Sequence, residues 1–232
     1  MEKEKQWQNI INSVSQKITS LINEDNIENI IQNNIVKAHL ENKAMMRFHE
    51  YYFKVLQNKE YFLQTKNVFQ EFGNKYGIKN FPKELYSQFD ENKIDILPNI
   101  EYGNFDGLYD VYRDFIISFH NFEFYSEKKH DILSIKSFYT KLVHTFIPKN
   151  YSMLDNNIIC YFNTDSVDFF EAFACISRVY ELWSEKNQDI IQRFREAIEK
   201  HDTKKVFPKD KITDLKILDM IFWVEAKKKY NY

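Results

Sequence analysis

Glycine, proline and cysteine are all scarce in this sequence of 232 residues, with four, four and two copies. Tight turns between strands and loops that cradle phosphates depend on glycine, so this scarcity argues against a sheet-rich fold and against a nucleotide-binding loop. The composition therefore predicts an all-α protein, a multi-helix globular domain. The two cysteines, Cys160 and Cys175, have no paired spacing, which predicts buried, reduced thiols in a cytoplasmic protein.

Long apolar runs are also missing, and the first residues lack the apolar core of a signal peptide. A bilayer-spanning helix needs about 20 apolar residues. We therefore expect a soluble cytoplasmic protein with no membrane partner. No histidine or cysteine shows metal-ligand spacing, and no motif of a known nucleophile or cofactor site is present, so neither a metal nor a cofactor is expected. The sequence does not indicate an oligomeric state.

Charge is nearly balanced overall, with a formal net charge of −2, but it is unevenly placed. Residues 200–232 hold nine lysines and five acids, a local charge of +4. A basic end of this kind suits contact with phosphate, although a solvated lysine-rich tail is the commoner explanation.

Apolar residues recur at helical spacing along most of the chain. They predict helices over 2–23, 27–40, 43–72, 105–124, 166–184 and 187–200, and a last one capped by Thr213. The 43–72 helix is expected to end at Gly73 and Asn74, and the 166–184 helix to be capped by Asp165 and Ser166. We predict one helical domain, 1–232. The least regular part, 78–104, would be the boundary in an alternative division into 1–77 and 105–232.

The chain is organised around residues 137–155, which read S-F-x-x-K-x-x-H-x-F-x-P followed by a loop and an aspartate. The pattern predicts a short helix that starts near Lys141 and is stopped by Pro148, then a second helix capped by Asp155. The two form a hairpin-like pair around residues 138–162. An extended loop of this length spans up to about 23 Å, enough to return Asp155 to the side of Lys141.

This pattern resembles a group of uncharacterised bacterial proteins, and its arrangement is similar to the lysine–aspartate core of the helix-hairpin-helix DNA glycosylases. The resemblance covers roughly residues 130–225, so 105–232 would be the glycosylase-like core. The sequence departs from the glycosylase pattern in two places, and both departures weaken the expected contact with the DNA backbone more than the lysine–aspartate pair. No glycine follows Gly107, although the glycosylase hairpin normally carries glycines, and Ser152–Leu154 stand where a proline is expected.

The resemblance implies excision of a damaged or modified base from DNA, with Lys141 as nucleophile and Asp155 stabilising the oxocarbenium-like transition state. Lysine attacks only when unprotonated, so burial or a neighbouring cation must lower its pKa. The excised base needs a pocket, ideally lined with aromatic rings. His144, on the same helical face as Lys141, and the aromatic Tyr139 are the candidate substrate contacts. Nucleic acid is the expected partner, DNA ahead of RNA.

Other interpretations remain open. In the alternative interpretation, Asp155 is a plain helix cap, Lys141 a solvated lysine, His144 a satisfied core histidine and Asp219 a solvated flank. Arg113 and His120 lie two turns apart on one predicted helix and resemble the R-x(4–6)-H motif of the HEPN ribonucleases of defence and toxin systems. A helical binding protein without catalysis is the third alternative.

Overall fold

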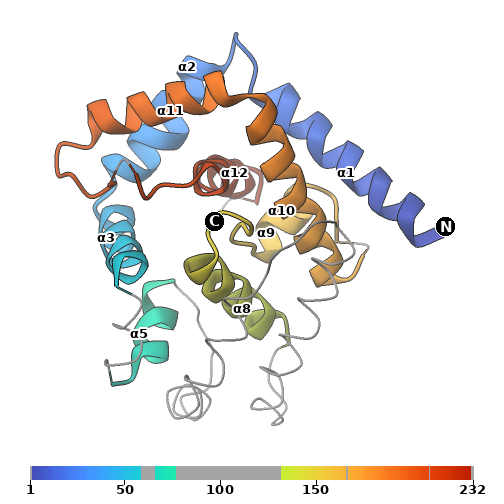
Figure 1. The fold of residues 1–232 in the computed structure, drawn as a ribbon, viewed down its shortest axis with the longest axis horizontal. Coiled ribbons are helices and arrows are strands. Elements are labelled where there is room, and N and C mark those ends of the chain that lie inside the picture. The colour runs from blue at the N-terminus through green and yellow to red at the C-terminus, as the bar shows by residue number, and fades with distance from the viewer. Residues whose placement is uncertain (1, 59–65, 77–131, 166, 209, 231–232) are drawn as a thin grey trace.

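The computed structural model describes residues 2–58, 66–76, 132–165, 167–208 and 210–230. The described part is all-α and contains no strand, as the scarcity of glycine predicts. At its centre lies α12 (Asp214–Tyr230), which contacts η1, α9, α10 and α11. Figure 1 looks nearly along α12 and shows the other helices arranged around it. A helix that is covered on several sides needs apolar residues around most of its circumference, and 215, 217, 218, 220, 221 and 222 are all buried.

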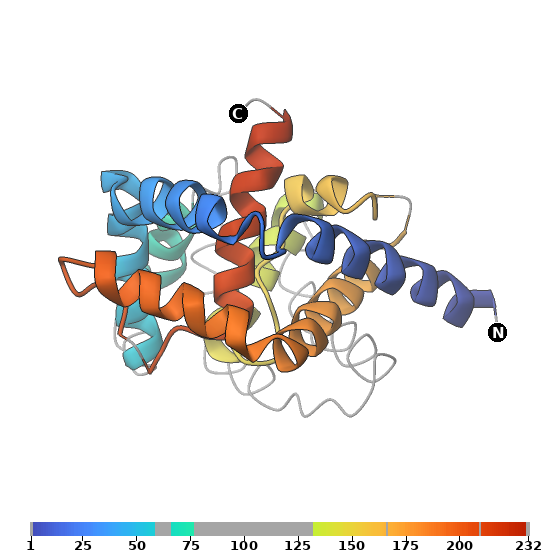
Figure 2. The same cartoon turned by 90° about the horizontal axis from the view of Figure 1, so that it is seen from above.

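The N-terminal part begins with α1 (Glu2–Leu21), which packs Trp7, Ile10, Val14 and Ile18 inward and contacts α10. A short α2 (Ile27–Ile30) continues directly into η1 (Ile31–Leu40), a π-helix. The sequence pattern predicts an ordinary helix over 27–40, so the wider turn is a departure. Side chains on η1 bond to α12, which anchors this segment against the central helix. Figure 2 shows η1 and α11 on the same side of α12.

The predicted 43–72 helix is divided. The helix α3 (Lys43–Gln57) is capped by Asn42, whose side chain accepts hydrogen bonds from the amides of Ala44 and Met45. A separate α5 (Val68–Lys75) follows Asn67, whose left-handed backbone (φ 57°) does not continue a helix. Gly73 and Asn74 were expected to end the helix and instead lie within α5.

The central stretch forms α8 (Ile132–Phe146), a loop through Pro148, and α9 (Asn156–Tyr161). Asp155 caps α9 as predicted, accepting a hydrogen bond from the amide of Ile158 at 3.1 Å. The expected helix start near Lys141 is wrong, because α8 begins nine residues earlier and Lys141 lies in its interior. The loop nevertheless returns to α8, since the carbonyl of Leu154 accepts hydrogen bonds from Ser137 and Thr140.

The pair α8–α9 packs on α10 (Phe169–Lys186), where the ring of Tyr139 meets Phe170 edge-on and Phe162 meets Tyr180. The cap of α10 is Asp168, not the expected Asp165–Ser166 pair. Next comes α11 (Gln188–His201), and the hydroxyl of Thr213 caps α12 as predicted.

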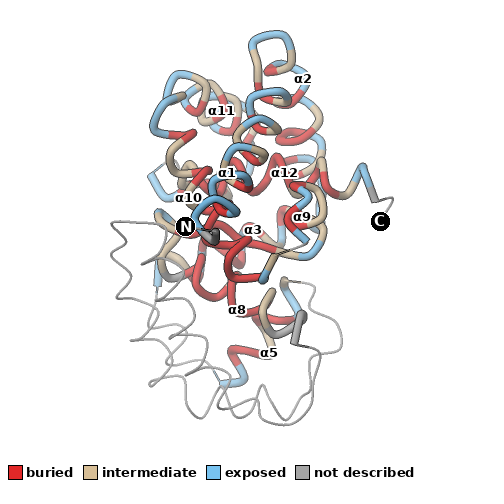
Figure 3. The backbone as a smooth tube through the Cα atoms, turned by 90° about the vertical axis from the view of Figure 1, so that its right-hand side faces the viewer, coloured by how far each residue is buried: buried red, intermediate tan, exposed pale blue. Residues whose placement is uncertain are grey.

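One hydrophobic cluster runs from Trp7 to Ala226 and includes residues from every helix of the described part. Figure 3 shows where along the backbone the buried and the exposed residues lie. The proposed boundary at 78–104 lies outside the described residues, as do Arg113 and His120, so both remain predictions. Cys175 is buried and Cys160 is half-buried, and both thiols are free. Within the described part, no helix combines the length and the apolar character needed to cross a bilayer.

Candidate active site

A cavity of about 500 Å³ lies between the α8–α9 pair and the central helix α12. Its wall combines lysines and carboxylates with aromatic rings and methionines, and it receives side chains from η1, α3, α5, α8, α9 and α12. The lining residues are His39, Ala44, Met45, Phe48, Lys75, Tyr76, Ser137, Lys141, Met153, Leu154, Asp155, Asn156, Asn157, Ile158, Lys216, Asp219, Met220 and Trp223.

Lys141 reaches this cavity from the interior of α8. Its amine donates to the hydroxyl of Ser137 at 2.5 Å, and that hydroxyl donates in turn to the carbonyl of Leu154 at 3.2 Å. Burial lowers the pKa of Lys141, and the Lys216 cation adds to the lowering, whereas the carboxylates of Asp155 and Asp219 oppose it. The Ser137 proton is committed to Leu154 and is therefore not donated to the lone pair of a neutral Lys141 amine.

Asp155 lines the same cavity from the start of α9. One carboxylate oxygen, Oδ1, is used by the cap of α9. Within the described part of the chain, the other oxygen accepts no hydrogen bond and Asp155 forms no ion pair with Lys141. The carboxylate is therefore both a helix cap and a negative charge available to a ligand, so the capping interpretation and the functional one are compatible.

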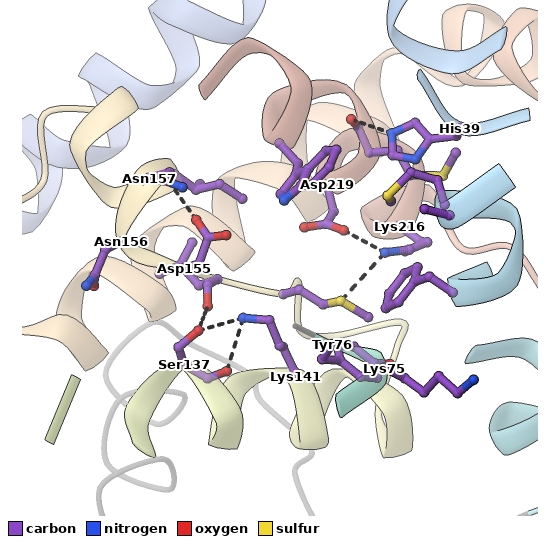
Figure 4. A pocket seen from close by; sticks show the side chains of 18 residues that line it. His39, Lys75, Tyr76, Ser137, Lys141, Asp155, Asn156, Asn157, Lys216 and Asp219 are labelled. Carbon is purple, nitrogen blue, oxygen red and sulfur yellow. Dashed lines mark hydrogen bonds and ion pairs between the residues drawn. The ribbon is translucent and has the colours of Figure 1, made fainter. Parts of the chain in front are cut away.

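A second lysine–carboxylate pair lies across the cavity (Figure 4). Lys216 and Asp219, one turn apart on α12, form an ion pair of 2.7 Å, and only 2% and 5% of these residues is exposed. The ammonium of Lys216 also contacts the sulfur of Met153 at 3.6 Å and the ring faces of Phe48 and Tyr52. Burial raises the pKa of Asp219, and Lys216 opposes this rise.

Two buried histidines, His39 and His49, lie beside the cavity. His39 lines the cavity, and its ring bonds through Nδ1 to Nε2 of His49 and through Nε2 to the carbonyl of Met220, each at 3.1 Å. The carbonyl can only accept, so Nε2 of His39 donates and Nδ1 accepts from His49. Burial lowers the pKa of His39 to about 3 and that of His49 well below its usual range, so both rings are neutral.

The two candidate substrate contacts, Tyr139 and His144, do not line this cavity. Tyr139 is buried against α10 and His144 is buried behind the cavity, and neither lines it. Nδ1 of His144 donates to the carbonyl of Tyr151 at 2.5 Å, and Nε2 accepts from the hydroxyl of Tyr52 at 2.8 Å. His144 thus bonds to Tyr52, and the ring of Tyr52 faces Lys216.

The structure therefore brings Lys141 and Asp155 together, and it adds a pair that sequence reasoning missed. The interpretation of Asp219 as a solvated flank is wrong, because Asp219 is buried on the side of α12 where its partner Lys216 meets Met153, Phe48 and Tyr52. The signal that could have revealed it is the charge pair Lys216–Asp219 within an otherwise apolar segment. Among the described residues, no group of three histidine, cysteine, aspartate or glutamate side chains is placed to hold a metal ion.

Comparisons with protein-family models, with curated proteins and with solved structures find no match to this chain.

Proposed function

We propose that this protein is a DNA glycosylase-like enzyme that excises a damaged or modified base, with Lys141 as the nucleophile. The observation that carries the proposal is that Lys141, on α8, and Asp155, at the start of α9, line one cavity. Burial lowers the pKa of Lys141, which increases the fraction of neutral amine that can attack. The resemblance of residues 137–155 to the glycosylase core agrees with this assignment.

In the proposed reaction, the Lys141 amine attacks the sugar carbon C1′ as the bond from C1′ to the base breaks. The electron pair of that bond leaves with the base, which takes a proton from water. The new secondary ammonium then loses a proton, and opening of the sugar ring gives an imine. Hydrolysis of the imine returns the free amine of Lys141 and an aldehyde at the abasic site.

Asp155 stabilises the positive charge that develops on the sugar as the bond breaks. Its capping bond to Ile158 fixes the carboxylate in place, leaving the second oxygen for this role. A carboxylate held in advance costs little reorganisation during the reaction, which is why such groups are effective.

The rest of the cavity suits an extruded base. Phe48, Tyr76 and Trp223 provide aromatic surface, and Met45 and Met153 provide polarisable apolar contacts. A volume of about 500 Å³ lies within the range of small-ligand pockets. Two lysines could contact phosphate, since Lys75 is exposed and lines the cavity, and Lys227 lies over the ring of the lining residue Trp223 at 3.9 Å.

The test is covalent trapping. An oligonucleotide with a single abasic site carries the aldehyde that the imine step requires, so borohydride should reduce the imine and link the DNA to Lys141. Peptide mapping identifies the lysine. Lys141→Gln should abolish the cross-link, whereas Lys186→Gln, which removes an exposed lysine of α10 outside the cavity, should leave it unchanged.

Base excision is then measured on duplexes that carry oxidised, deaminated or alkylated bases. Release of a base by the wild-type protein, lost in Lys141→Gln, supports the proposal. Cross-linking that survives in Lys141→Gln, or no cross-link and no release with any of these substrates, would overturn it.

A further inference from the structure

The buried pair Lys216–Asp219 influences the pKa of Lys141 but takes part in no step of the proposed reaction, although it lines the cavity in which that reaction would take place. Figure 4 shows it on the opposite side from Lys141 and Ser137. One side of the cavity thus holds the proposed nucleophile. The other holds a second charged pair that a bound ligand would meet.

The Lys216 ammonium is held firmly. It donates to Oδ2 of Asp219 at 2.7 Å, contacts the Met153 sulfur at 3.6 Å, and lies 5.3 Å and 5.1 Å from the ring centres of Phe48 and Tyr52. The Tyr52 ring is itself fixed by the hydrogen bond of its hydroxyl to His144. The position of Lys216 in turn fixes the orientation of the Asp219 carboxylate.

The second oxygen of that carboxylate, Oδ1, accepts no hydrogen bond from any described residue. It is also not one of the fully enclosed polar atoms without a partner, so it is open to the cavity. In Figure 4 it points away from Lys216, toward the side on which Asp155 lies. A carboxylate oxygen in a mostly apolar cavity is costly to leave without a donor, and a ligand with an N–H group would satisfy it.

We propose that Oδ1 of Asp219 recognises the bound base by accepting a hydrogen bond from an N–H group on its edge. The ligand class is a planar nucleobase with an exocyclic amino group, and a base that lacks this donor is rejected. This inference rests on the proposed function for the identity of the ligand. The ring of Trp223, over which Lys227 lies, and that of Phe48 are available to contact the faces of the base.

The experiment measures equilibrium binding of free base analogues by ligand-observed NMR titration, which requires no catalysis. Two matched pairs isolate the donor. In these pairs 9-methyladenine is compared with 9-methylpurine, and 1-methylcytosine with 1-methylpyrimidin-2-one, so that each pair differs only in the exocyclic amino group. The wild-type protein should bind at least one amino compound roughly 10- to 100-fold more tightly than its partner, as expected for a hydrogen bond to a charged group.

Two variants test which carboxylate causes the preference for amino compounds. In Asp219→Asn, the amide oxygen faces Lys216 and the amide N–H faces the cavity, so the preference for amino compounds should fall to within about twofold. Asp155→Asn changes the other cavity carboxylate and should leave the preference intact. Loss of the preference in Asp155→Asn, with retention in Asp219→Asn, would overturn the assignment.

The wild-type comparison decides the proposal even if Asp219→Asn does not fold. Equal affinity within both pairs, or no binding of any analogue, would overturn it. The result is separable from the proposed chemistry. Donor-dependent binding without borohydride trapping would support recognition by Asp219 and reject catalysis by Lys141, and trapping without donor-dependent binding would do the reverse.

Discussion

Lys141 and Asp155 line one cavity without forming an ion pair. Lys141 bonds to Ser137 within its own helix, and Asp155 bonds to the amide of Ile158 at the start of the next. A direct ion pair would stabilise the protonated amine and raise its pKa. The observed arrangement places the carboxylate nearby and leaves burial as the main influence on the pKa of Lys141, which it lowers.

Asp155→Asn should separate the capping role of this residue from the proposed electrostatic one. Asparagine caps helices about as well as aspartate, so the free energy of unfolding should change by no more than about 0.5 kcal/mol. Base excision should fall by about 100-fold or more, because the negative charge opposite the developing cation is lost. Single-turnover rates and urea unfolding measure the two effects. If neither the excision rate nor the free energy of unfolding changes, Asp155 acts only as a helix cap.

Lys141 should react as an amine at lower pH than an exposed lysine does. Its pKa lies below the ordinary 10.5, so the neutral fraction at a given pH is larger. Reductive methylation with formaldehyde and cyanoborohydride, followed by peptide mapping, gives the rate at each lysine as a function of pH. The midpoint for Lys141 should fall below that of Lys186, the exposed internal control. Coincident profiles would contradict an activated amine.

Lys141→Met should abolish trapping without lowering the melting temperature at neutral pH. The depressed pKa means that the folded state disfavours the charged amine, a penalty present below the folded-state pKa and relieved as the pH rises toward 10.5. Removing the amine removes that penalty, while the Ser137 hydroxyl keeps its bond to Leu154. A drop of several degrees in calorimetry would instead assign Lys141 a structural role.

Removing one partner of the ion pair Lys216–Asp219 should lower the free energy of unfolding strongly, whereas removing both charges should lower it little. Lys216→Met leaves the Asp219 carboxylate buried without its partner, which costs about 3 to 5 kcal/mol. The double change Lys216→Met/Asp219→Asn should recover most of this loss. The defect of the single variant should also shrink in acid, since Asp219 has a raised pKa and protonation removes the unpaired charge. Urea unfolding at several pH values tests both statements, and a single variant as stable as wild type would refute the first.

The buried histidines should make the fold sensitive to acid. His39, His49 and His144 have depressed pKa values, with His39 and His144 at about 3, because burial disfavours the charged ring. The unfolded chain binds protons below about 6.5 and the folded chain does not, so stability falls as the pH drops from 6.5 toward 3. Three protons correspond to a slope of at most about 4 kcal/mol per pH unit.

His144→Gln provides the check on this slope. Glutamine retains groups able to bond to Tyr52 and Tyr151 but does not titrate, so the slope should fall by about one proton. Stability at neutral pH will also drop by an amount that depends on how well glutamine fits. An unchanged slope would mean that His144 titrates alike in the folded and unfolded states.

Local features of the sequence determined the helical class, the inward stripe of α1, and the caps at Asp155 and Thr213. These depend on spacing and short-range hydrogen bonds, which neighbouring residues fix by themselves. The same local reasoning placed Asp155 within reach of Lys141, because the length of the Pro148 loop limits where the chain can return.

Tertiary structure decided which charged residues are buried and what they meet. Asp219 lies beside an apolar stripe, a position that is solvated on a surface helix, but Met153 and the rings of α3 meet its partner Lys216 and the pair is buried. His144 shares a helix with Lys141, yet it faces Tyr52, because α3 packs against that side of α8. Burial depends on neighbours that are distant in sequence, and local spacing carries no information about them.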